Sequence, residues 1–216
     1  MRHAQVRMAG PGLTKGAAAV HSRCRPIWMW GLAMEGETFR LYTDAQLQPV
    51  FDAMARQCHG LIDHSRPLWL VGVLRRGAPL ADRLREGLLR LAPALQIERL
   101  DLKVKRYGDD LTLLHPETRM DRPDVPADAL SGQQVLVVDD VLYQGHSLFK
   151  VLGFLHDCAA DPVRTAVLVD RCVTRLPIRA DVVGLQLQIS PTDVIECRVP
   201  PFEQELAIDL FRPQRG

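Results

Sequence analysis

The sequence predicts an α/β fold with a central parallel β-sheet flanked by helices. The first observation is three strongly apolar runs, which lie within 68–74, 134–138 and 164–170. Strands buried on both faces show such runs instead of an alternating pattern. The second observation is that apolar residues three and four apart, typical of a helix, follow the first two runs. Such strands form right-handed crossover units, and ligands bind at the carboxyl ends of the strands.

The composition is that of a globular protein without a global charge. The chain has 216 residues, of which 47% are hydrophobic and 25% charged, and its formal net charge is +1. These values are ordinary for a globule and give no support to a nucleic-acid-binding field. The five cysteines are scattered without a Cys-x-x-Cys pair, which favours a reducing cytoplasm over a structural metal site. No stretch is long and apolar enough to span a membrane, so we expect a cytoplasmic protein without a membrane partner.

The first 36 residues differ from the rest. Residues 1–33 contain arginines and a lysine but no acidic residue, and they show no periodicity. A transit peptide, a signal peptide and a disordered tail are the alternatives. We favour a poorly ordered extension over residues 1–36, with Met34 as the real start, and a single domain over residues 37–216.

Residues 39–42 alternate and predict an edge strand, which a helix follows. Thr43 or Asp44 can cap that helix, and Pro49 falls near its first turn, where proline is tolerated. The apolar face of the helix is formed by Leu47, Val50, Phe51, Met54, Cys58 and Leu61.

Three further segments complete the prediction. Residues 97–104 alternate, which predicts another exposed or edge strand. Residues 106–129 are polar and proline-containing, and a loop of that length in a compact domain is typical of a lid or of disorder. Residues 194–199 and 206–211 predict a closing β-hairpin.

The stretch 134–147 combines the parts of a phosphate- and diol-binding site. The apolar run 134–138 ends on Asp139 and Asp140, Gly145 lies near the end of the next loop, and Ser147 opens a helix. Free backbone amides at a helix start bind phosphate, and glycine lets the backbone approach it. Carboxylates bind hydroxyl groups or hydrated Mg²⁺. Ribose 5-phosphate carries a phosphate and a diol, so it fits both parts.

The segment from Asp139 to Ser147 resembles the 5-phosphoribosyl 1-pyrophosphate (PRPP) motif of type I phosphoribosyltransferases. The resemblance implies that family's fold: a central parallel sheet flanked by helices, a small hood and a C-terminal β-hairpin. It also implies that the acid pair contacts the ribose hydroxyls and that the loop holds the 5′-phosphate. The implied PRPP-binding residues are Asp139, Asp140, Val141, Leu142, Tyr143, Gln144, Gly145, His146 and Ser147. Taken alone, an acid pair at a strand end is also typical of phosphoacceptor receiver domains.

Within that family the chain is similar to the PyrR group of bifunctional pyrimidine-operon attenuators and uracil phosphoribosyltransferases. The run 167–184 closely resembles the equivalent PyrR segment over its length. The chain departs from the usual PyrR motifs at Arg75, Gln144, His146 and Ser147, and Cys172-Val173 replaces Gly-His.

The resemblance implies the remaining site residues. Pyrophosphate binding falls to Arg75, Arg76, Gly77, Lys105 and Arg106, and the catalytic residues are Asp139, Asp140 and Arg76. Base binding falls to Arg171, Val182 and Val183, together with the backbone of 181–184. A non-prolyl cis peptide is expected near Arg75–Arg76.

The implied reaction converts uracil and PRPP to UMP and pyrophosphate, with Mg²⁺ held at Asp139 and Asp140 through substrate or water. One alternative is a catalytically weak PyrR-like regulator that binds an mRNA leader and senses UMP in the same pocket. Another is a phosphoribosyltransferase for a different base, such as a purine. The family also implies a homo-oligomer, with a dimer as the expected state.

Overall fold

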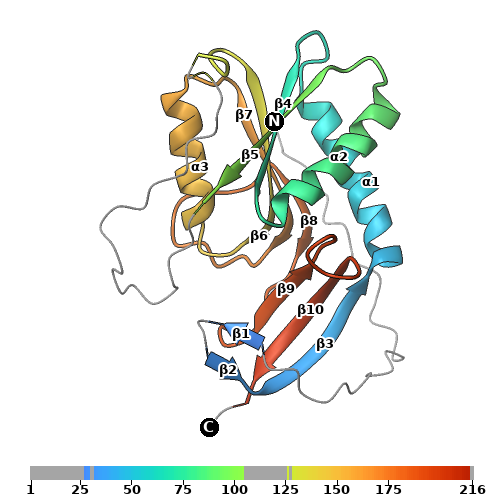
Figure 1. Cartoon of the computed structure of the whole chain (residues 1–216), viewed down its shortest axis with the longest axis vertical. Helices are drawn as coiled ribbons and strands as arrows, with labels where there is room; N and C mark the ends of the chain where they lie inside the picture. Colours follow the sequence, from blue (N-terminus) through green and yellow to red (C-terminus); the bar gives the residue numbers. More distant parts are fainter. Residues whose placement is uncertain (1–26, 30–31, 105–125, 127, 215–216) are drawn as a thin grey trace, which may run out of the picture.

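The computed structural model describes residues 27–29, 32–104, 126 and 128–214, and its main body is a five-stranded parallel sheet (Figure 1). The strand order is β5-β4-β6-β7-β8, and every neighbouring pair is parallel. The strands are β4 (Leu68–Leu74), β5 (Ile97–Lys103), β6 (Gln134–Leu142), β7 (Val163–Asp170) and β8 (Val182–Gln186). The predicted fold class is therefore confirmed, and β5 is the predicted edge strand.

Helices cover both faces of this sheet (Figure 1). On one face, α1 (Asp44–Leu61) and α2 (Gly77–Leu91) bury their apolar residues together with Leu70, Leu136 and Leu168 of the sheet. On the other face, α3 (His146–Asp157) packs on a second cluster that includes Val71 and Val137. Alternate residues of one strand thus enter different cores, which explains why the strand sequences are continuously apolar.

The ends of the chain form a second, antiparallel sheet of three strands. Its order is β3-β10-β9, with β3 (Gly36–Thr43), β9 (Val194–Arg198) and β10 (Ala207–Pro213). The predicted closing hairpin is confirmed, and β3 extends it by pairing with β10. Figure 1 shows this sheet beyond the carboxyl ends of the main strands β6 and β8.

The segment predicted to be an extension is described only in part. Strands β1 (Ile27–Met29) and β2 (Leu32–Met34) form an antiparallel two-stranded ladder. Residues 1–26 lie outside the described residues. Strand β3 begins at Gly36, one residue before the predicted start of the domain.

Helix α1 follows its sequence prediction except at its end. Thr43 is the N-cap, and its backbone N–H donates to Gln46 Oε1 at 2.9 Å. Pro49 lies inside the helix. Leu61 was predicted on the apolar face but is 40% exposed, because the helix ends there and none of the described elements covers it.

Strand β6 extends farther than predicted. The aliphatic run was expected to stop before the acid pair, yet β6 continues through Leu142. Its ladder with β4 ends at Val138, whereas its ladder with β7 continues to the Leu142–Asp170 pair. The acid pair therefore sits inside a strand that has lost one neighbour, which opens that side to the loop after β4.

Among the described residues, no helix is long and apolar enough to cross a membrane.

Candidate functional site

The acid pair is buried just beyond the point where the ladder between β4 and β6 ends. Asp139 and Asp140 are 4% and 2% exposed. Asp139 Oδ1 accepts from the backbone N–H of Asp140 at 2.8 Å, and Asp140 Oδ1 accepts from that of Val141 at 2.9 Å. Hydrogen bonds to the charged form of a carboxylate fix its orientation and compensate part of its desolvation. Each carboxylate keeps a second oxygen that these two bonds do not use.

A phosphate cradle of loop and helix follows the acid pair. Gly145 is the N-cap of α3 with φ 90°, a left-handed conformation that glycine adopts without the steric cost of a Cβ. The first amides of α3 lie at His146 and Ser147, where the helix begins one residue before its predicted start. The segment after β7 supports this loop, because Arg175 N–H donates to Gln144 O at 3.1 Å. The arrangement suits the binding of a phosphate group.

The loop after β4 lies directly against the acid pair. An ideal Cβ built on Gly77 would stand 2.5 Å from Val138 O and 3.2 Å from Asp139 Cα. Only glycine permits this approach, so the predicted pyrophosphate segment and the predicted PRPP motif meet in space. The expected non-prolyl cis peptide is present one bond earlier, between Leu74 and Arg75.

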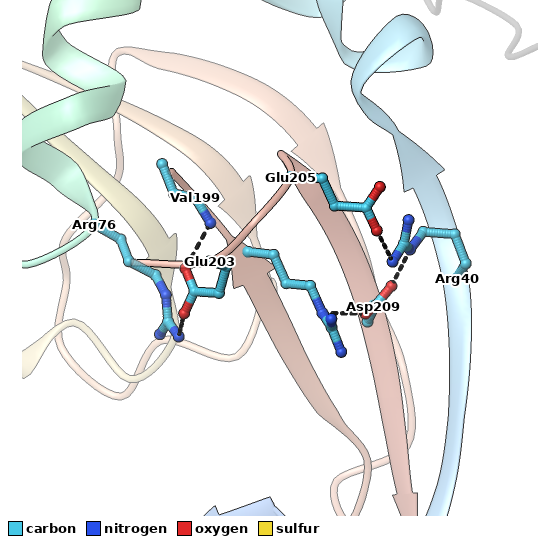
Figure 2. Close-up of polar contacts among 7 residues, drawn as sticks. Arg40, Arg76, Val199, Glu203, Glu205 and Asp209 are labelled. Carbon is cyan, nitrogen blue, oxygen red and sulfur yellow. Dashed lines mark hydrogen bonds and ion pairs between the residues drawn. The ribbon is translucent and has the colours of Figure 1, made fainter. Parts of the chain in front are cut away.

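Both arginines of this loop contact the loop between β9 and β10, and Figure 2 shows the contact of Arg76. Arg76 Nη2 lies 2.5 Å from Glu203 Oε1. Glu203 Oε2 accepts from the backbone N–H of Val199 at 2.7 Å. The guanidinium of Arg75 lies over the ring of Phe202, 5.1 Å from its centroid. The C-terminal sheet thus holds the arginine pair beside the acids.

Arg76 and the carboxylates near it shift one another's pKa values. Burial disfavours the charged form of Arg76, but the Glu203 hydrogen bond and the charge of Asp140 outweigh it and raise the arginine pKa. Burial also disfavours ionised Glu203, yet the hydrogen bonds from Arg76 and from Val199 N–H lower its pKa. Glu196 differs from Glu203: its burial raises its pKa, although Arg198 and Arg76 oppose that effect. The charge of Arg76 therefore interacts with several carboxylates.

The predicted base residues occupy different environments. Arg171 is buried, donates to Asp193 O at 3.2 Å and lies over the Tyr143 ring at 5.1 Å, so it connects the end of β7 with the phosphate loop. Val182 is fully buried in the core, which leaves only its backbone for contact with a base. Val183 is partly buried and pairs with Val167 in β7.

Several predicted elements fall outside the described residues. Lys105 and Arg106 belong to the segment 105–125, which also contains most of the predicted lid. Two other predicted segments, 75–77 and 139–147, lie at the carboxyl end of the parallel sheet, where Gly77 approaches Val138 and Asp139.

Sequence reasoning missed three residues at this carboxyl end of the sheet. Phe202 and Glu203 come from a loop more than a hundred residues after their arginine partners, and nothing in the local pattern marks them. Asp170 ends β7, pairs with Leu142 and accepts from Cys172 N–H at 2.7 Å. The rule that polar residues at carboxyl ends of parallel strands face the ligand could have found Asp170.

The donor set fits Mg²⁺ carried by a substrate. No group of three or more His, Cys, Asp or Glu suited to hold a metal exists in the part of the chain that the structure describes. Mg²⁺ keeps several waters and is commonly bound through one or two carboxylates plus substrate phosphates. The buried oxygens of Asp139 and Asp140 meet that requirement.

Comparisons with known proteins identify the family of the chain. The family model of the phosphoribosyl transferase domain matches residues 42–202. The bifunctional protein PyrR of Deinococcus radiodurans is 34% identical over 166 residues, which cover 75% of this chain and 90% of that protein. The PyrR protein of Roseiflexus sp. is 38% identical over 157 residues, covering 68% and 81%.

Solved structures show the same fold at lower identity. The hypoxanthine phosphoribosyltransferase of Trypanosoma cruzi has a TM-score of 0.63 and 19% identity, covering 81% of this chain and 97% of that chain. The chain therefore belongs to the type I phosphoribosyltransferase family, in which its curated relatives carry the name PyrR.

Proposed function

We propose that the protein transfers the phosphoribosyl group of PRPP to uracil, with UMP and pyrophosphate as products. The observation that carries the proposal is the contact of Gly77 with Val138 and Asp139. It joins an arginine-bearing loop, suited to a pyrophosphate, to an acid pair and a helix N-terminus suited to ribose 5-phosphate. The uracil preference is supported by the PyrR relatives, because the hypoxanthine enzymes share only the fold at this identity.

The residues would act by positioning and by charge stabilisation. The 5′-phosphate is held by the amides at the start of α3, and the ribose hydroxyls by Asp139 and Asp140. As the bond from C1′ to pyrophosphate breaks, positive charge develops at the ribose and negative charge on the leaving group. The buried carboxylates stabilise the first, and the Arg76 guanidinium stabilises the second. No covalent nucleophile is required, because both reactants are held in place.

Mg²⁺ would be held by Asp139 and Asp140 through water or substrate oxygens. When bound, the ion neutralises charge on the pyrophosphate group. The chain's own contribution is to fix the two carboxylates through the N–H groups of Asp140 and Val141.

The test is pyrophosphate release from PRPP and Mg²⁺, with uracil, hypoxanthine and orotate offered separately. Turnover with uracil alone is the expected result. Turnover with hypoxanthine alone would replace the uracil assignment with a purine one. Absence of turnover with every base would overturn the enzymatic proposal.

A second candidate is an RNA-binding regulator that senses UMP in the same pocket. It is favoured by the word bifunctional in the names of the relatives. The test is binding to the leader of the protein's own operon across a salt series. Phosphate contacts release counterions, so affinity should fall steeply with salt if the RNA is bound.

The proposal also covers the cellular location and the oligomeric state of the protein. We propose a cytoplasmic location, which the odd number and the scattered positions of the cysteines favour. We further propose a homo-oligomer, most simply a dimer. One solved structure of the Trypanosoma cruzi hypoxanthine phosphoribosyltransferase addresses the role of its C-terminal region in its oligomeric state, so oligomer formation is a relevant question for this fold.

A further inference from the structure

We propose that Glu203 is a positioning residue that fixes Arg76 for the pyrophosphate group of PRPP, an inference that rests on the proposed function. Figure 2 shows the contact between the loop of the C-terminal sheet and the end of the β4 loop. Residue 203 lies outside every motif by which the chain resembles its family, and one residue beyond the matched domain.

Glu203 is held at both of its oxygens. Oε1 lies 2.5 Å from Arg76 Nη2, and Oε2 accepts from Val199 N–H at 2.7 Å. Its side chain is only 23% exposed. A carboxylate fixed at one oxygen by the backbone is a rigid partner for the guanidinium at the other, so Arg76 loses little further rotational freedom when an anion arrives.

Arg76 needs such a partner because other carboxylates also attract its guanidinium. Its charge interacts with Asp140 and Glu196 as well as with Glu203. Its Nε is buried and has no hydrogen-bond partner within the described ranges. Without Glu203, the guanidinium is drawn towards the other carboxylates and away from the loop position that suits pyrophosphate.

The neighbouring contact supports the same role for the whole loop. Phe202 underlies the guanidinium of Arg75 while Glu203 pairs with Arg76. Consecutive residues of one loop therefore engage consecutive arginines of another. The aromatic contact holds the guanidinium of Arg75, and the carboxylate contact orients the guanidinium of Arg76.

The chain offers a matched control in Glu205. Glu205 lies in the same loop and pairs with an arginine, Arg40, at 2.8 Å (Figure 2). Arg40 belongs to β3 and pairs with Asp209 of β10, so this contact serves the small sheet. Glu203→Gln and Glu205→Gln each remove one negative charge from this loop, and only the first touches Arg76.

The sign of the effect separates positioning from simple electrostatics. Removing a negative charge near an anion site tightens anion binding if only Coulomb forces act. Loss of positioning weakens it. We expect Glu203→Gln to weaken binding of inorganic pyrophosphate with Mg²⁺ by about 10-fold, which is less than the roughly 100-fold that a 1 Å misplacement can cost in an aligned site. UMP, which has no pyrophosphate, should bind both variants like wild type.

The experiment is calorimetric titration of wild type, Glu203→Gln and Glu205→Gln with pyrophosphate and with UMP, followed by steady-state kinetics. The KM for PRPP should rise in Glu203→Gln while the KM for uracil stays constant, and Glu205→Gln should match wild type. Glu203→Gln should add nothing in an Arg76→Ala background, because no arginine remains to be positioned. If Glu203→Gln does not fold, Glu203→Asp, which is one methylene shorter, should show the same weakening.

The outcomes separate this inference from the proposed function. A wild type that binds pyrophosphate and turns over uracil, with a Glu203→Gln variant that binds pyrophosphate equally or more tightly, overturns the inference alone. Equal weakening in Glu205→Gln also overturns it, because the loop charge would then be the cause. A wild type that binds neither pyrophosphate nor PRPP overturns both.

Discussion

Among single residues, the site depends on buried charges whose orientation the backbone fixes. Asp139 and Asp140 are nearly inaccessible, and each accepts a hydrogen bond from the next backbone N–H. Burying a carboxylate costs free energy unless it is hydrogen-bonded or paired. The two hydrogen bonds compensate only part of this cost, and the remaining cost fits the ligand-binding role that we propose for the pair.

Asp140→Asn tests that explanation. The amide keeps the shape of the side chain and an oxygen that can accept from Val141 N–H. It loses the negative charge that, in the proposed mechanism, would stabilise the ribose cation. We expect kcat/KM for PRPP to fall about 100-fold, roughly 2.7 kcal/mol, with an unchanged unfolding temperature. Asp157→Asn, at the exposed end of α3, is the control. Kinetics equal to wild type would remove Asp140 from the catalytic residues.

Among the secondary-structure elements, the start of α2 lies closer to strand β6 than a side chain would permit. The β4–α2 connection crosses β6 at Gly77, where the added Cβ would meet backbone atoms. Backbone cannot rotate away as a flexible side chain can, so a side chain at this position forces the two elements apart. The loop between β9 and β10 then braces the arginines of the same connection. The N-terminus of α2 is thus fixed from both sides.

Gly77→Ala tests the close approach. Relief of the 2.5 Å contact with Val138 O requires α2 to move from β6, and overpacking of this kind costs about 1–3 kcal/mol. We expect that loss in the free energy of unfolding, measured by urea denaturation, together with weaker pyrophosphate binding. Gly153→Ala in α3, where an added Cβ has no described neighbour within 4 Å, should instead stabilise by about 0.5–1 kcal/mol. A stable Gly77→Ala variant with unchanged pyrophosphate affinity would contradict the prediction.

Across the molecule as a whole, two sheets share the task of forming the site. The parallel sheet supplies the acid pair and the phosphate cradle. The antiparallel sheet supplies Glu203 and is itself held by Asp209, which pairs with Arg40 at 2.5 Å (Figure 2) and with Arg198 at 2.6 Å. Function should therefore depend on the two sheets remaining together.

Cysteine labelling reports on that global integrity. Burial, with the charge of Asp181, raises the pKa of the Cys58 thiol to about 12, so almost no thiolate exists at pH 8. We expect iodoacetamide to label the exposed Cys172 in the native protein and to reach Cys58 only as urea unfolds it. Peptide mass spectrometry resolves the two sites. Equal labelling of both in native buffer would show that the α1 face opens locally.

The fold class and the local parts of the site could be predicted from the sequence. Apolar runs identify the parallel strands β4, β6 and β7 because burial on both faces removes alternation, and the periodicity after the first two identifies α2 and α3. The parallel strand β8 was not predicted. The stretch from Asp139 to Ser147 is contiguous, so its acids, glycine and helix start are all visible in one motif.

The contacts that join this motif to the rest of the site follow from tertiary packing. The contact of Gly77 with Val138 depends on how far β4 and β6 pair, and the partners of Arg75 and Arg76 come from a loop that folds back from the C-terminal sheet. The burial of the Val182 side chain in the core is likewise set by packing, and it leaves the backbone, which the prediction included, as the part that can contact a base. Local patterns record which face of an element is buried, whereas contacts between distant loops arise only when the packed elements set their spacing.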